Sequence, residues 1–387
     1  MAREYQICTR CLMDTSDPQI QFDEKGLCNH CRFYDERIKQ NVFTGEDGKK
    51  RLSLLVEKVK KNGKGKEYDC ILGLSGGNDS TYVAYLAKQL GLRPYLVSLD
   101  NGYDPEITKR NVQRIAKYLN TELHVYTIDP EEFRDLQIAF LKSGVVNLEV
   151  LTDHAIIAML YRTAAKLGTK YVLSGTNLVT EGILPVSWGY DSKDLVNILD
   201  IYKKHGSGRK LKTVPKLSIA RFMYYYYFRQ IEFVSPLNYV SYIKKDAKEL
   251  FAREFGYEDY GAKHCESIFT KFYQFHILPR RLHVDKRRAH LSCLVCSGQM
   301  TREEALKELE KPPYAKEELE SDKRFVLNRL GLTEEEFESL ISRPVRSNFE
   351  YRTDRAIMRI LLFGFSKWLA IKSLLKGISN LPKKIGL

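Results

Sequence analysis

The sequence predicts an α/β fold in which helices cover both faces of a parallel sheet, preceded by a zinc ribbon and followed by a mainly helical region. Between residues 68 and 174, short apolar runs alternate with amphipathic stretches of helical length, a pattern typical of a parallel sheet. Two Cys-x-x-Cys pairs occupy the first 31 residues, and the chain beyond residue 182 is irregular and aromatic-rich. A length of 387 residues favours two or three domains over one core.

Two predicted segments precede the sheet. Residues 1–40 are rich in turns and cysteines, show little hydrophobic periodicity and form the predicted metal-binding module. Residues 41–66 are predicted to be a helical linker, because Leu52, Leu54, Leu55 and Val59 recur on one helix face before a run rich in Gly and Lys.

The predicted sheet domain spans residues 67–200. Its strands lie at 68–74, 94–99, 122–128 and 171–174, and its helices at 80–90, 104–119 and 153–167. Ligands of parallel sheets bind beyond the carboxyl ends of the strands, so the loops after these strands are where we expect a site. Residues 201–387 form the predicted basic, mainly helical region for substrate or partner, with surface helices at 302–309 and 333–341.

The formal charge of +13 is concentrated in one part of the chain. Residues 201–300 hold 19 Lys and Arg against 8 Asp and Glu. A basic surface there suits an anionic substrate, meaning a nucleotide, a phosphorylated metabolite or a nucleic acid. Ordinary solubilising charge is the alternative interpretation.

The apolar segments of the chain bear on its expected cellular compartment. The first residues lack the apolar run of a signal peptide, and no stretch is long enough to span a bilayer, so the cytoplasm is expected. In that compartment the eight cysteines are expected to be thiols or metal ligands. Residues 356–378 are apolar with interspersed Lys and Arg. That pattern favours a helix facing the core or a partner over peripheral membrane contact.

A glycine loop carries the clearest chemical signal. The string Leu-Gly-Leu-Ser-Gly-Gly-Asn-Asp-Ser occupies residues 72–80, between a predicted strand and a predicted helix. Glycines let the backbone approach a ligand closely, and the free N–H groups and dipole of a helix N-terminus favour a bound phosphate. The loop matches neither the Walker pattern nor the dinucleotide pattern GxGxxG. A tight turn that simply needs glycine would explain Gly-Gly, but not the whole string.

The second signal is the pair of knuckles formed by Cys8 with Cys11 and Cys28 with Cys31. Two such pairs with sixteen residues between them match a tetrahedral Zn²⁺ ribbon. An iron–sulfur centre can use similar spacing, although paired knuckles favour zinc. Four cysteines fill the coordination shell, so the predicted site is structural.

Three further features are less specific. Cys265, Cys293 and Cys296 could assemble a second cluster with His264 or His290, although buried unligated cysteines are favoured. The basic run at 280–290 could hold pyrophosphate or the acidic groups of a substrate. His154 could be a site residue, although a satisfied surface histidine is at least as good an interpretation.

The glycine loop resembles the PP-loop of the ATP pyrophosphatase superfamily, whose pattern is Ser-Gly-Gly-x-Asp-Ser. The turn at 100–102 resembles that superfamily's adenosine-contacting turn, and the segment at 174–177 resembles its second ATP-side loop. The resemblance implies a PP-loop domain that splits ATP into AMP and pyrophosphate with Mg²⁺, in which Asp79 is a possible Mg²⁺ contact. The implied ATP-binding residues are Leu74, Ser75, Gly76, Gly77, Asp79, Ser80, Asp100, Asn101, Gly102, Gly175, Thr176 and Asn177.

The wider sequence, from about residue 5 to 351, resembles the N-acetyl sugar amidotransferases of the WbpG type, which serve bacterial surface-polysaccharide synthesis. The likeness lies in residues 8–18, 22–31, 266–274 and 285–292. It implies conversion of the N-acetyl group of a sugar, expected to be nucleotide-linked, into an acetamidino group by adenylation and attack by ammonia. Ammonia would come from a separate glutaminase subunit, and nucleic acid is not expected as a partner. The implied catalytic residues are Asp79, Ser75, Lys286 and Arg287.

Two alternatives remain open from the sequence. A tRNA-modifying PP-loop enzyme would share the ATP site, zinc ribbon and basic surface, and would give Cys265, Cys293 and Cys296 a function. A scaffold that binds nucleotide without catalysis would share the loop and the ribbon.

Overall fold

A computed structural model describes residues 4–261, 265–355 and 357, and its centre is a five-stranded sheet in which every pairing is parallel. The strand order is β3-β2-β1-β4-β5. Leu72 of β1 pairs with Leu96 of β2 on one side and with Leu173 of β4 on the other. The strands are β1 (Cys70–Gly73), β2 (Pro94–Asp100), β3 (Leu123–Thr127), β4 (Tyr171–Leu173) and β5 (Glu232–Val234).

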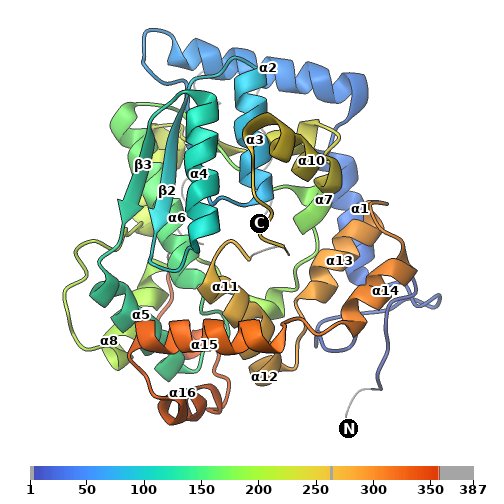
Figure 1. Ribbon diagram of the computed structural model, residues 1–387, viewed down its shortest axis with the longest axis vertical. Helices are drawn as coiled ribbons and strands as arrows, with labels where there is room; N and C mark the ends of the chain where they lie inside the picture. Colours follow the sequence, from blue (N-terminus) through green and yellow to red (C-terminus); the bar gives the residue numbers. More distant parts are fainter. Residues whose placement is uncertain (1–3, 262–264, 356, 358–387) are drawn as a thin grey trace.

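One face of the sheet is covered by helices that come before, between and after its strands in the chain (Figure 1). These are α2 (Gly45–Gly63), α3 (Asn78–Gln89), α4 (Glu106–Leu119) and α10 (Lys244–Phe255). Their buried side chains, among them Val59, Val83 and Phe251, form one core with Leu72 of β1. Side chains alternate across a strand, so Leu72 faces this layer while its neighbour Ile71 belongs to the core of the opposite face.

The opposite face packs on α6 (Val150–Leu167), with α5 (Pro130–Ser143) and α8 (Leu195–His205) outside it. α6 is apolar over most of its surface and begins after Glu149, close to where the strands end. Its buried residues include Ala155, Ala158 and Ala164, whose small side chains suit close packing against a sheet. α6 therefore carries its first turn to the carboxyl end of the sheet.

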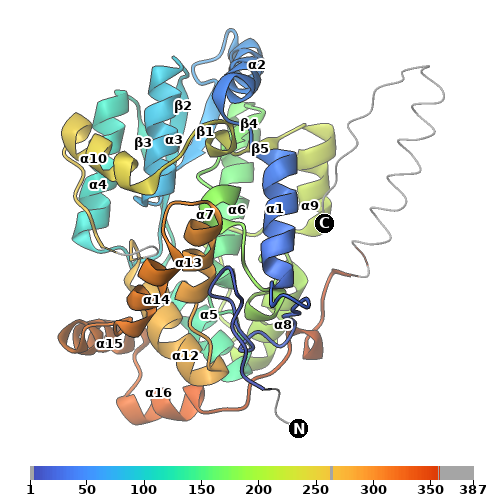
Figure 2. The same cartoon turned by 90° about the vertical axis from the view of Figure 1, so that its right-hand side faces the viewer.

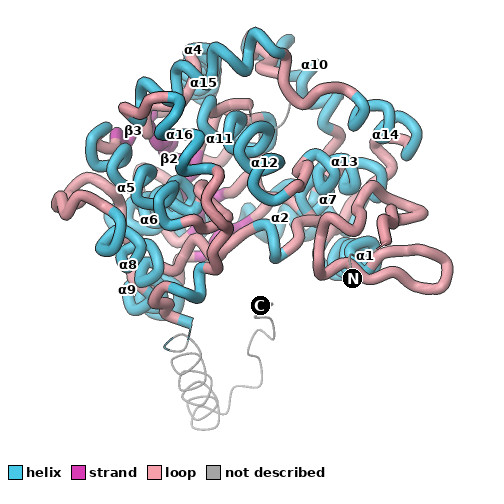
Figure 3. The backbone as a smooth tube through the Cα atoms, turned by 90° about the horizontal axis from the view of Figure 1, so that it is seen from below, coloured by secondary structure: helices cyan, strands magenta, loops and turns pink. Residues whose placement is uncertain are grey.

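The C-terminal helices lie beyond the carboxyl ends of the strands, below the sheet in Figure 1. They are α11 (Ile268–Phe272), α12 (Leu278–Leu282), α13 (Arg287–Cys296), α14 (Arg302–Glu310), α15 (Lys316–Leu330) and α16 (Glu334–Ile341), with a π turn at Tyr273–Ile277 between the first two. α15 packs on α11 and α5. Seen from below in Figure 3, helices and loops surround this end of the sheet. The strand-end loops are thus covered by later parts of the chain.

The N-terminal module lies beside this C-terminal group. Residues 4–28 form loops that lead into α1 (Asn29–Asn41), which packs on the short α7 (Leu178–Glu181) next to α13. Figure 2 shows α1, α7 and α13 together on one side of the molecule. The other helical segments are η1 (Val186–Trp188), α9 (Ile219–Met223), a π turn at Tyr224–Phe228, η3 (Pro236–Tyr239) and η5 (Asn348–Glu350).

The predicted fold class is confirmed: a parallel sheet with helices on both faces, a four-cysteine cluster and a helical C-terminal region. The predicted strands and helices are present, with ends that differ by a few residues. β5 was not predicted, since a run of three residues beside an aromatic segment has no periodicity of its own, and it lies beyond residue 200. Of the apolar tail at 356–378, residues 356 and 358–378 lie outside the described residues. Over the described part of the chain, no helix is long and apolar enough to cross a membrane.

Candidate functional site

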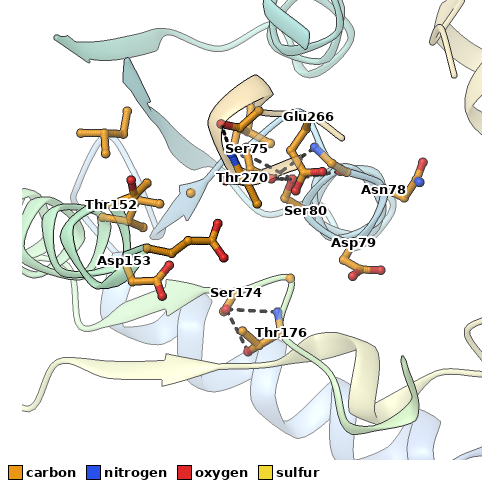
Figure 4. A pocket seen from close by; sticks show the side chains of 18 of the residues that line it. Ser75, Asn78, Asp79, Ser80, Thr152, Asp153, Ser174, Thr176, Glu266 and Thr270 are labelled. Carbon is orange, nitrogen blue, oxygen red and sulfur yellow. Dashed lines mark hydrogen bonds between the residues drawn. The ribbon is translucent and has the colours of Figure 1, made fainter. Parts of the chain in front are cut away.

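A cavity of about 410 Å³ opens at the carboxyl ends of β1, β2 and β4. Figure 4 shows its residues: Ser75 and Ser80 of the glycine loop face Asp153 of α6, with Ser174 and Thr176 on a further side. Three parts of the chain line it, namely the strand-end loops, the first half of α6 and the C-terminal region. The position is the one that parallel-sheet topology predicts for a ligand.

The glycine loop turns sharply between β1 and α3. Gly76 has a φ of 76°, and a Cβ there would lie 2.7 Å from the Thr108 methyl group, so glycine is required at this position. Ser75 Oγ lies 3.2 Å from Ser80 Oγ, which brings the two hydroxyl groups together at the start of the helix. The Thr81 hydroxyl donates to Gly77 O at 2.8 Å and closes the turn.

Backbone donors at this helix start are already bonded to hydroxyl groups. The Gly77 N–H donates to Ser75 Oγ at 3.2 Å, and the Asn78 N–H donates to the Tyr260 hydroxyl at 3.2 Å. These oxygens occupy the positions that phosphate oxygens take at a helix N-terminus. The Asn78 side chain is 3% exposed, and neither of its polar atoms has a hydrogen-bond partner. Hydrogen-bonding groups are thus concentrated at the start of α3, where a phosphate group would bind.

The structure brings most of the predicted ATP residues to the cavity. Leu74, Ser75, Gly77, Asp79, Ser80, Asn101, Gly175 and Thr176 line it. Gly175 packs directly on α3, because a Cβ there would lie 2.7 Å from Ser80 N. The β1 and β4 loops therefore touch through backbone atoms.

Four predicted ATP residues do not line the cavity and instead shape the loops around it. Gly76 O accepts from the Tyr257 hydroxyl, and Asp100 accepts from the Gly102 N–H at 2.8 Å. Asn177 caps α7 by accepting from the Thr180 N–H at 2.8 Å. Gly102 O accepts from Arg329 of α15 at 2.8 Å, so the C-terminal region covers the β2 turn.

Asp79 is one of the residues that line the cavity next to the glycine loop. The Tyr242 hydroxyl donates to its Oδ1 at 2.5 Å. Burial first, and then the charge of Asp79, raises the pKa of Tyr242, so this hydroxyl keeps its proton. Tyr242 therefore orients the Asp79 carboxylate, whose oxygens are of the kind that a hard cation such as Mg²⁺ prefers.

The remaining lining is strongly acidic. Asp79, Asp104, Glu149, Asp153, Glu181 and Glu266 line the cavity, against Lys244 and Lys286. Burial, followed by the charges of Asp100 and Glu266, raises the pKa of Asp104 to about 7. A nucleoside triphosphate entering this cavity would need a divalent cation, and hard carboxylate oxygens are the ligands that Mg²⁺ prefers.

Asp153 lies on the first turn of α6. Its side chain is accessible from the cavity, but the surrounding protein reduces its hydration. This reduced hydration is the main cause that raises the pKa of Asp153 to about 7. Glu149 raises the pKa further, whereas Lys286 lowers it. Perturbed carboxyl groups in a cavity are typical of sites that transfer protons.

The C-terminal region supplies a whole wall of the cavity. Glu266, Ser267, Thr270, Gln274 and Lys286 line it from α11, the π turn and the start of α13. Lys286 Nζ lies 3.6 Å from Glu149 Oε2, so it links this wall to α6. Apolar side chains of β2, β4 and α6 also line the cavity and provide a surface of the kind that a flat base packs on: Val97, Leu99, Ile156, Met159, Leu160 and Leu173.

The structure does not bring Arg287 to the cavity. Its guanidinium pairs with Asp285 at 2.7 Å and donates to backbone oxygens at the end of α14, including Lys311 O at 2.8 Å. Arg280 pairs with Glu338, and Arg281 donates to Gly144 O. Much of the basic run at 280–290 therefore joins elements, and Lys286 is its cation at the cavity.

The four N-terminal cysteines form a compact centre. Cys8 Sγ lies 3.8 Å from Cys31 Sγ, and Cys11 Sγ lies 3.7 Å from Cys28 Sγ. A tetrahedron with Zn–S bonds of about 2.3 Å has S–S edges of about 3.8 Å, so the donor set fits zinc. Backbone N–H groups of Arg10, Cys11 and Cys28 point at Cys8 Sγ, as expected around a thiolate ligand.

The other cysteines do not gather into a second cluster. Within the described ranges, Cys8, Cys11, Cys28 and Cys31 are the one group that meets metal-ligand geometry. Cys293 Sγ accepts from the Ile183 N–H at 3.2 Å, whereas Cys296 Sγ lies 3.8 Å from Cys31 Sγ. His264 lies outside the described residues. The arrangement gives no support to the three-cysteine chemistry of a tRNA-modifying enzyme.

His154 is a structural residue. It is buried, its Nδ1 donates to Ser192 O at 2.7 Å, and its Nε2 accepts from the Leu217 N–H at 3.1 Å. Burial lowers its pKa, so the neutral form is favoured. The sequence pointed to this part of α6, but it is the neighbouring Asp153 that lines the cavity.

Comparison with protein families gives two matches. Residues 49–220 match NAD synthase, and residues 266–363 match the C-terminal domain of WbpG-like LPS biosynthesis proteins. An uncharacterized protein of Methanocaldococcus jannaschii is 27% identical over 173 residues, which are 44% of this chain and 59% of that protein. The chain thus matches less than two thirds of the length of this relative.

Solved structures give distant similarities. The NH3-dependent NAD synthetase of Campylobacter jejuni is 20% identical, with a TM-score of 0.28 over 37% of this chain and 63% of that one. NMN synthetase of Francisella tularensis is 17% identical, with a TM-score of 0.28 over 62% and 97%. A predicted subunit of tRNA methyltransferase from M. jannaschii is 19% identical, with a TM-score of 0.27 over 47% and 73%.

Several residues that line the cavity lie in no recognisable sequence motif. Lys244 begins a helix far from the glycine loop, and Glu149 precedes another. Glu266 and Gln274 lie in the segment that resembles the sugar amidotransferases, which was the one available signal for them. Their meeting at one cavity depends on how the C-terminal region packs on the sheet.

Proposed function

Because this chain joins a PP-loop domain of the NAD synthase family to a WbpG-like C-terminal domain, we propose that it is an ATP-dependent sugar amidotransferase. The reaction converts the N-acetyl group of a sugar, carried on a nucleotide, into an acetamidino group. ATP is consumed to AMP and pyrophosphate. The product serves the synthesis of bacterial surface polysaccharide in the cytoplasm.

One observation carries this proposal: the WbpG-like segment itself completes the cavity at the glycine loop. Glu266, Ser267, Thr270, Gln274 and Lys286 all fall within the matched residues 266–363. A domain that only bound a partner would not need side chains beside the ATP loop. The substrate-specific part and the ATP-using part thus share one site.

The first step activates the amide. An amide carbonyl is a poor electrophile, so its oxygen attacks the α-phosphorus of ATP, the P–O bond to pyrophosphate breaks, and the oxygen becomes part of a leaving group. Ser75, Ser80 and the N–H groups at the start of α3 hold the pyrophosphate. Lys286 offsets negative charge on the phosphates from the opposite wall.

The second step introduces nitrogen. Ammonia attacks the activated carbon and AMP leaves. A separate glutaminase subunit supplies the ammonia, as the resemblance to the sugar amidotransferases implies. Asp79 would hold Mg²⁺, which would neutralise charge on the triphosphate. Zn²⁺ at the four cysteines would have a structural role.

The test is a reconstituted reaction. The protein is incubated with ATP, MgCl₂, an ammonium salt and a panel of nucleotide-linked N-acetyl sugars, and the sugar product is followed by mass spectrometry and by its new positive charge. We expect replacement of the amide oxygen by NH and equal amounts of AMP and pyrophosphate. Release of ADP and phosphate would contradict the mechanism.

A matched pair of variants separates catalysis from scaffolding. Ser75→Ala removes a hydroxyl at the phosphate end, whereas Ser53→Ala removes one from the exposed face of α2. We expect product formation to fall by about 10²-fold in the first variant and to stay unchanged in the second. Normal turnover by Ser75→Ala would instead favour a protein that binds nucleotide without using it.

A further inference from the structure

At the start of α6 the cavity is lined by polar groups to which the adenylation step assigns no role. Glu149 immediately precedes α6 and Asp153 lies one turn later, with the Asp153 N–H donating to Glu149 O at 3.0 Å. Residues four apart lie on one helix face, so both carboxylates are presented to the same space. Both line the cavity, together with Gln274 from the opposite wall.

Gln274 ties this group together and leaves one acceptor unused. Its Nε2 donates to Glu149 Oε2 at 3.0 Å, which fixes the orientation of its amide. The residue is 1% exposed, and its Oε1 has no hydrogen-bond partner. A buried acceptor without a donor costs free energy, and the cost is removed when a ligand with N–H groups binds next to it.

We propose that Glu149, Asp153 and Gln274 form the amine subsite of this cavity, and that Asp153 is the base for the amination step. The inference rests on the proposed function and names the residues that handle its nitrogen. The lone pair of ammonia forms a bond to the amide carbon of the adenylated sugar. One proton passes from that nitrogen to the Asp153 carboxylate, and the C–O bond to AMP breaks, so that AMP leaves with the electron pair.

The chemistry of the subsite suits this step. Ammonia and the amidine product offer N–H donors, and the product is a cation, which two carboxylates and an amide oxygen accept. The charged groups facing Asp153 are Glu149, which holds its pKa up, and Lys286, which lowers it. With a pKa of about 7, Asp153 can take up a proton during turnover and release it afterwards near neutral pH.

The test compares Asp153→Asn with the wild type in two partial reactions. Adenylation is followed by sugar-dependent exchange of labelled pyrophosphate into ATP without ammonia, and amination by formation of the acetamidino product. We expect exchange within about threefold of wild type and amination lowered by about 10²-fold, since a positioned base contributes roughly that factor. Asp153→Glu, which keeps the carboxylate, should recover part of the amination rate, and Glu57→Gln on the exposed surface of α2 is the charge-matched control.

The pH profile gives an independent readout. When rates are expressed per concentration of free ammonia, the wild-type amination rate should rise with pH through about 7 as Asp153 ionises. This rise should be absent in Asp153→Asn. Equal losses of exchange and amination, or a rise confined to the KM for the sugar, would overturn the assignment and leave the proposed function standing. Absence of sugar-dependent pyrophosphate release by the wild type would instead overturn the proposed function and the subsite with it.

Discussion

Two glycines determine how closely the loops approach one another at the phosphate end of the cavity. Gly76 adopts a left-handed conformation with a φ of 76°, while Gly175 meets the backbone of α3. At Gly175 the obstacle is a backbone atom, Ser80 N, only 2.7 Å from where a Cβ would lie. A backbone atom in a helix cannot rotate away as a side chain can, so any larger residue must push the β4 loop outward.

We therefore expect Gly175→Ala to weaken ATP binding while leaving the fold intact. Overpacking of this kind costs about 1–3 kcal/mol, and a cost of that size in the ATP-binding conformation would lower affinity by about 5-fold to 150-fold. Isothermal titration calorimetry with MgATP measures it. Gly189→Ala is the control, because the nearest atom to its added Cβ lies 3.9 Å away, and equal ATP affinity in the two variants would contradict the argument.

The raised pKa of Asp104 makes a prediction about stability. The folded protein holds this proton up to a pH of about 7, whereas an unfolded chain loses it near 3.8. The folded state therefore binds more protons between these values, and the free energy of unfolding falls as pH rises through them. The buried charge is a stability cost that is fully present above pH 7 and absent below about pH 4.

Asp104→Asn should remove that cost. At pH 8 and without Mg²⁺, we expect the free energy of unfolding to increase by about 1–3 kcal/mol, allowing for the partial exposure of the side chain. The gain should shrink as the pH is lowered toward 4. Urea unfolding at a series of pH values measures it, and a gain that does not depend on pH would show that the Asp104 charge is not its origin.

At the scale of elements, α13 connects the cysteine centre to the cavity. Lys286, directly before this helix, lines the cavity, while residues along the helix bind the N-terminal module. The Leu12 N–H donates to Ser292 Oγ at 3.0 Å, and Arg288 donates to Leu12 O at 2.9 Å. Arg288 also pairs with the buried Asp14 at 3.1 Å. The module that carries the four cysteines thus holds the helix that presents Lys286.

Removing the metal should consequently lower activity as well as stability. Metal binding supplies on the order of 10 kcal/mol to the folding of such a module, so loosening it should free α13. With MgCl₂ kept in excess, we expect a zinc-selective chelator to reduce turnover in the proposed reaction by at least about tenfold and to expose residues 4–28 to protease, with both effects reversed by added Zn²⁺.

Arg288→Met tests the same connection without a chelator. It removes the contacts to Leu12 and Asp14 but no metal ligand, and zinc release to a colorimetric chelator should become faster. Arg253→Gln is the control, since Arg253 is exposed and pairs with its neighbour Glu254. Identical release rates in the two variants would show that the helix and the module are held independently.

At the scale of the whole molecule, the charge lining the cavity is opposite in sign to the net charge of the chain. The chain carries +13, yet six carboxylates and two lysines line the cavity. Many of the basic residues join parts of the fold instead: Arg280 pairs with Glu338, Arg288 with Asp14, and Arg329 holds the β2 turn. The positive charge therefore stabilises the packing of the C-terminal region more than it attracts the triphosphate.

ATP binding should depend steeply on Mg²⁺ as a result. Without a divalent cation, a triphosphate and the carboxylates repel one another in a space where water screens poorly. We expect affinity for ATP to rise by at least about tenfold between zero and 5 mM MgCl₂, while affinity for adenosine stays constant. Equilibrium binding measurements at a series of MgCl₂ concentrations test this. They are made without a chelator, because a chelator would also remove zinc. An affinity for ATP that does not change with MgCl₂ would contradict the prediction.

Local patterns made much of the fold predictable. Apolar runs of strand length, helix lengths and the spacing of Cys8, Cys11, Cys28 and Cys31 depend on neighbouring residues only, and the predicted strands, helices and cysteine group are all present. The glycine loop was readable for the same reason, since its chemistry lies in consecutive residues between β1 and α3. β5 was missed because three residues gain their strand conformation from pairing with β4.

What the sequence determined by itself is the class of chemistry: a phosphate-binding loop on a parallel sheet, a thiolate centre and a resemblance to sugar amidotransferases. Only the tertiary structure decided which distant residues face that loop. It placed Glu149, Asp153, Gln274 and Lys286 together and turned Arg287 toward α14. The physical reason is that a charged side chain turns toward the partners that tertiary packing brings close to it. Such partners can be distant in the sequence: Glu149 and Lys286 lie more than a hundred residues apart in the chain.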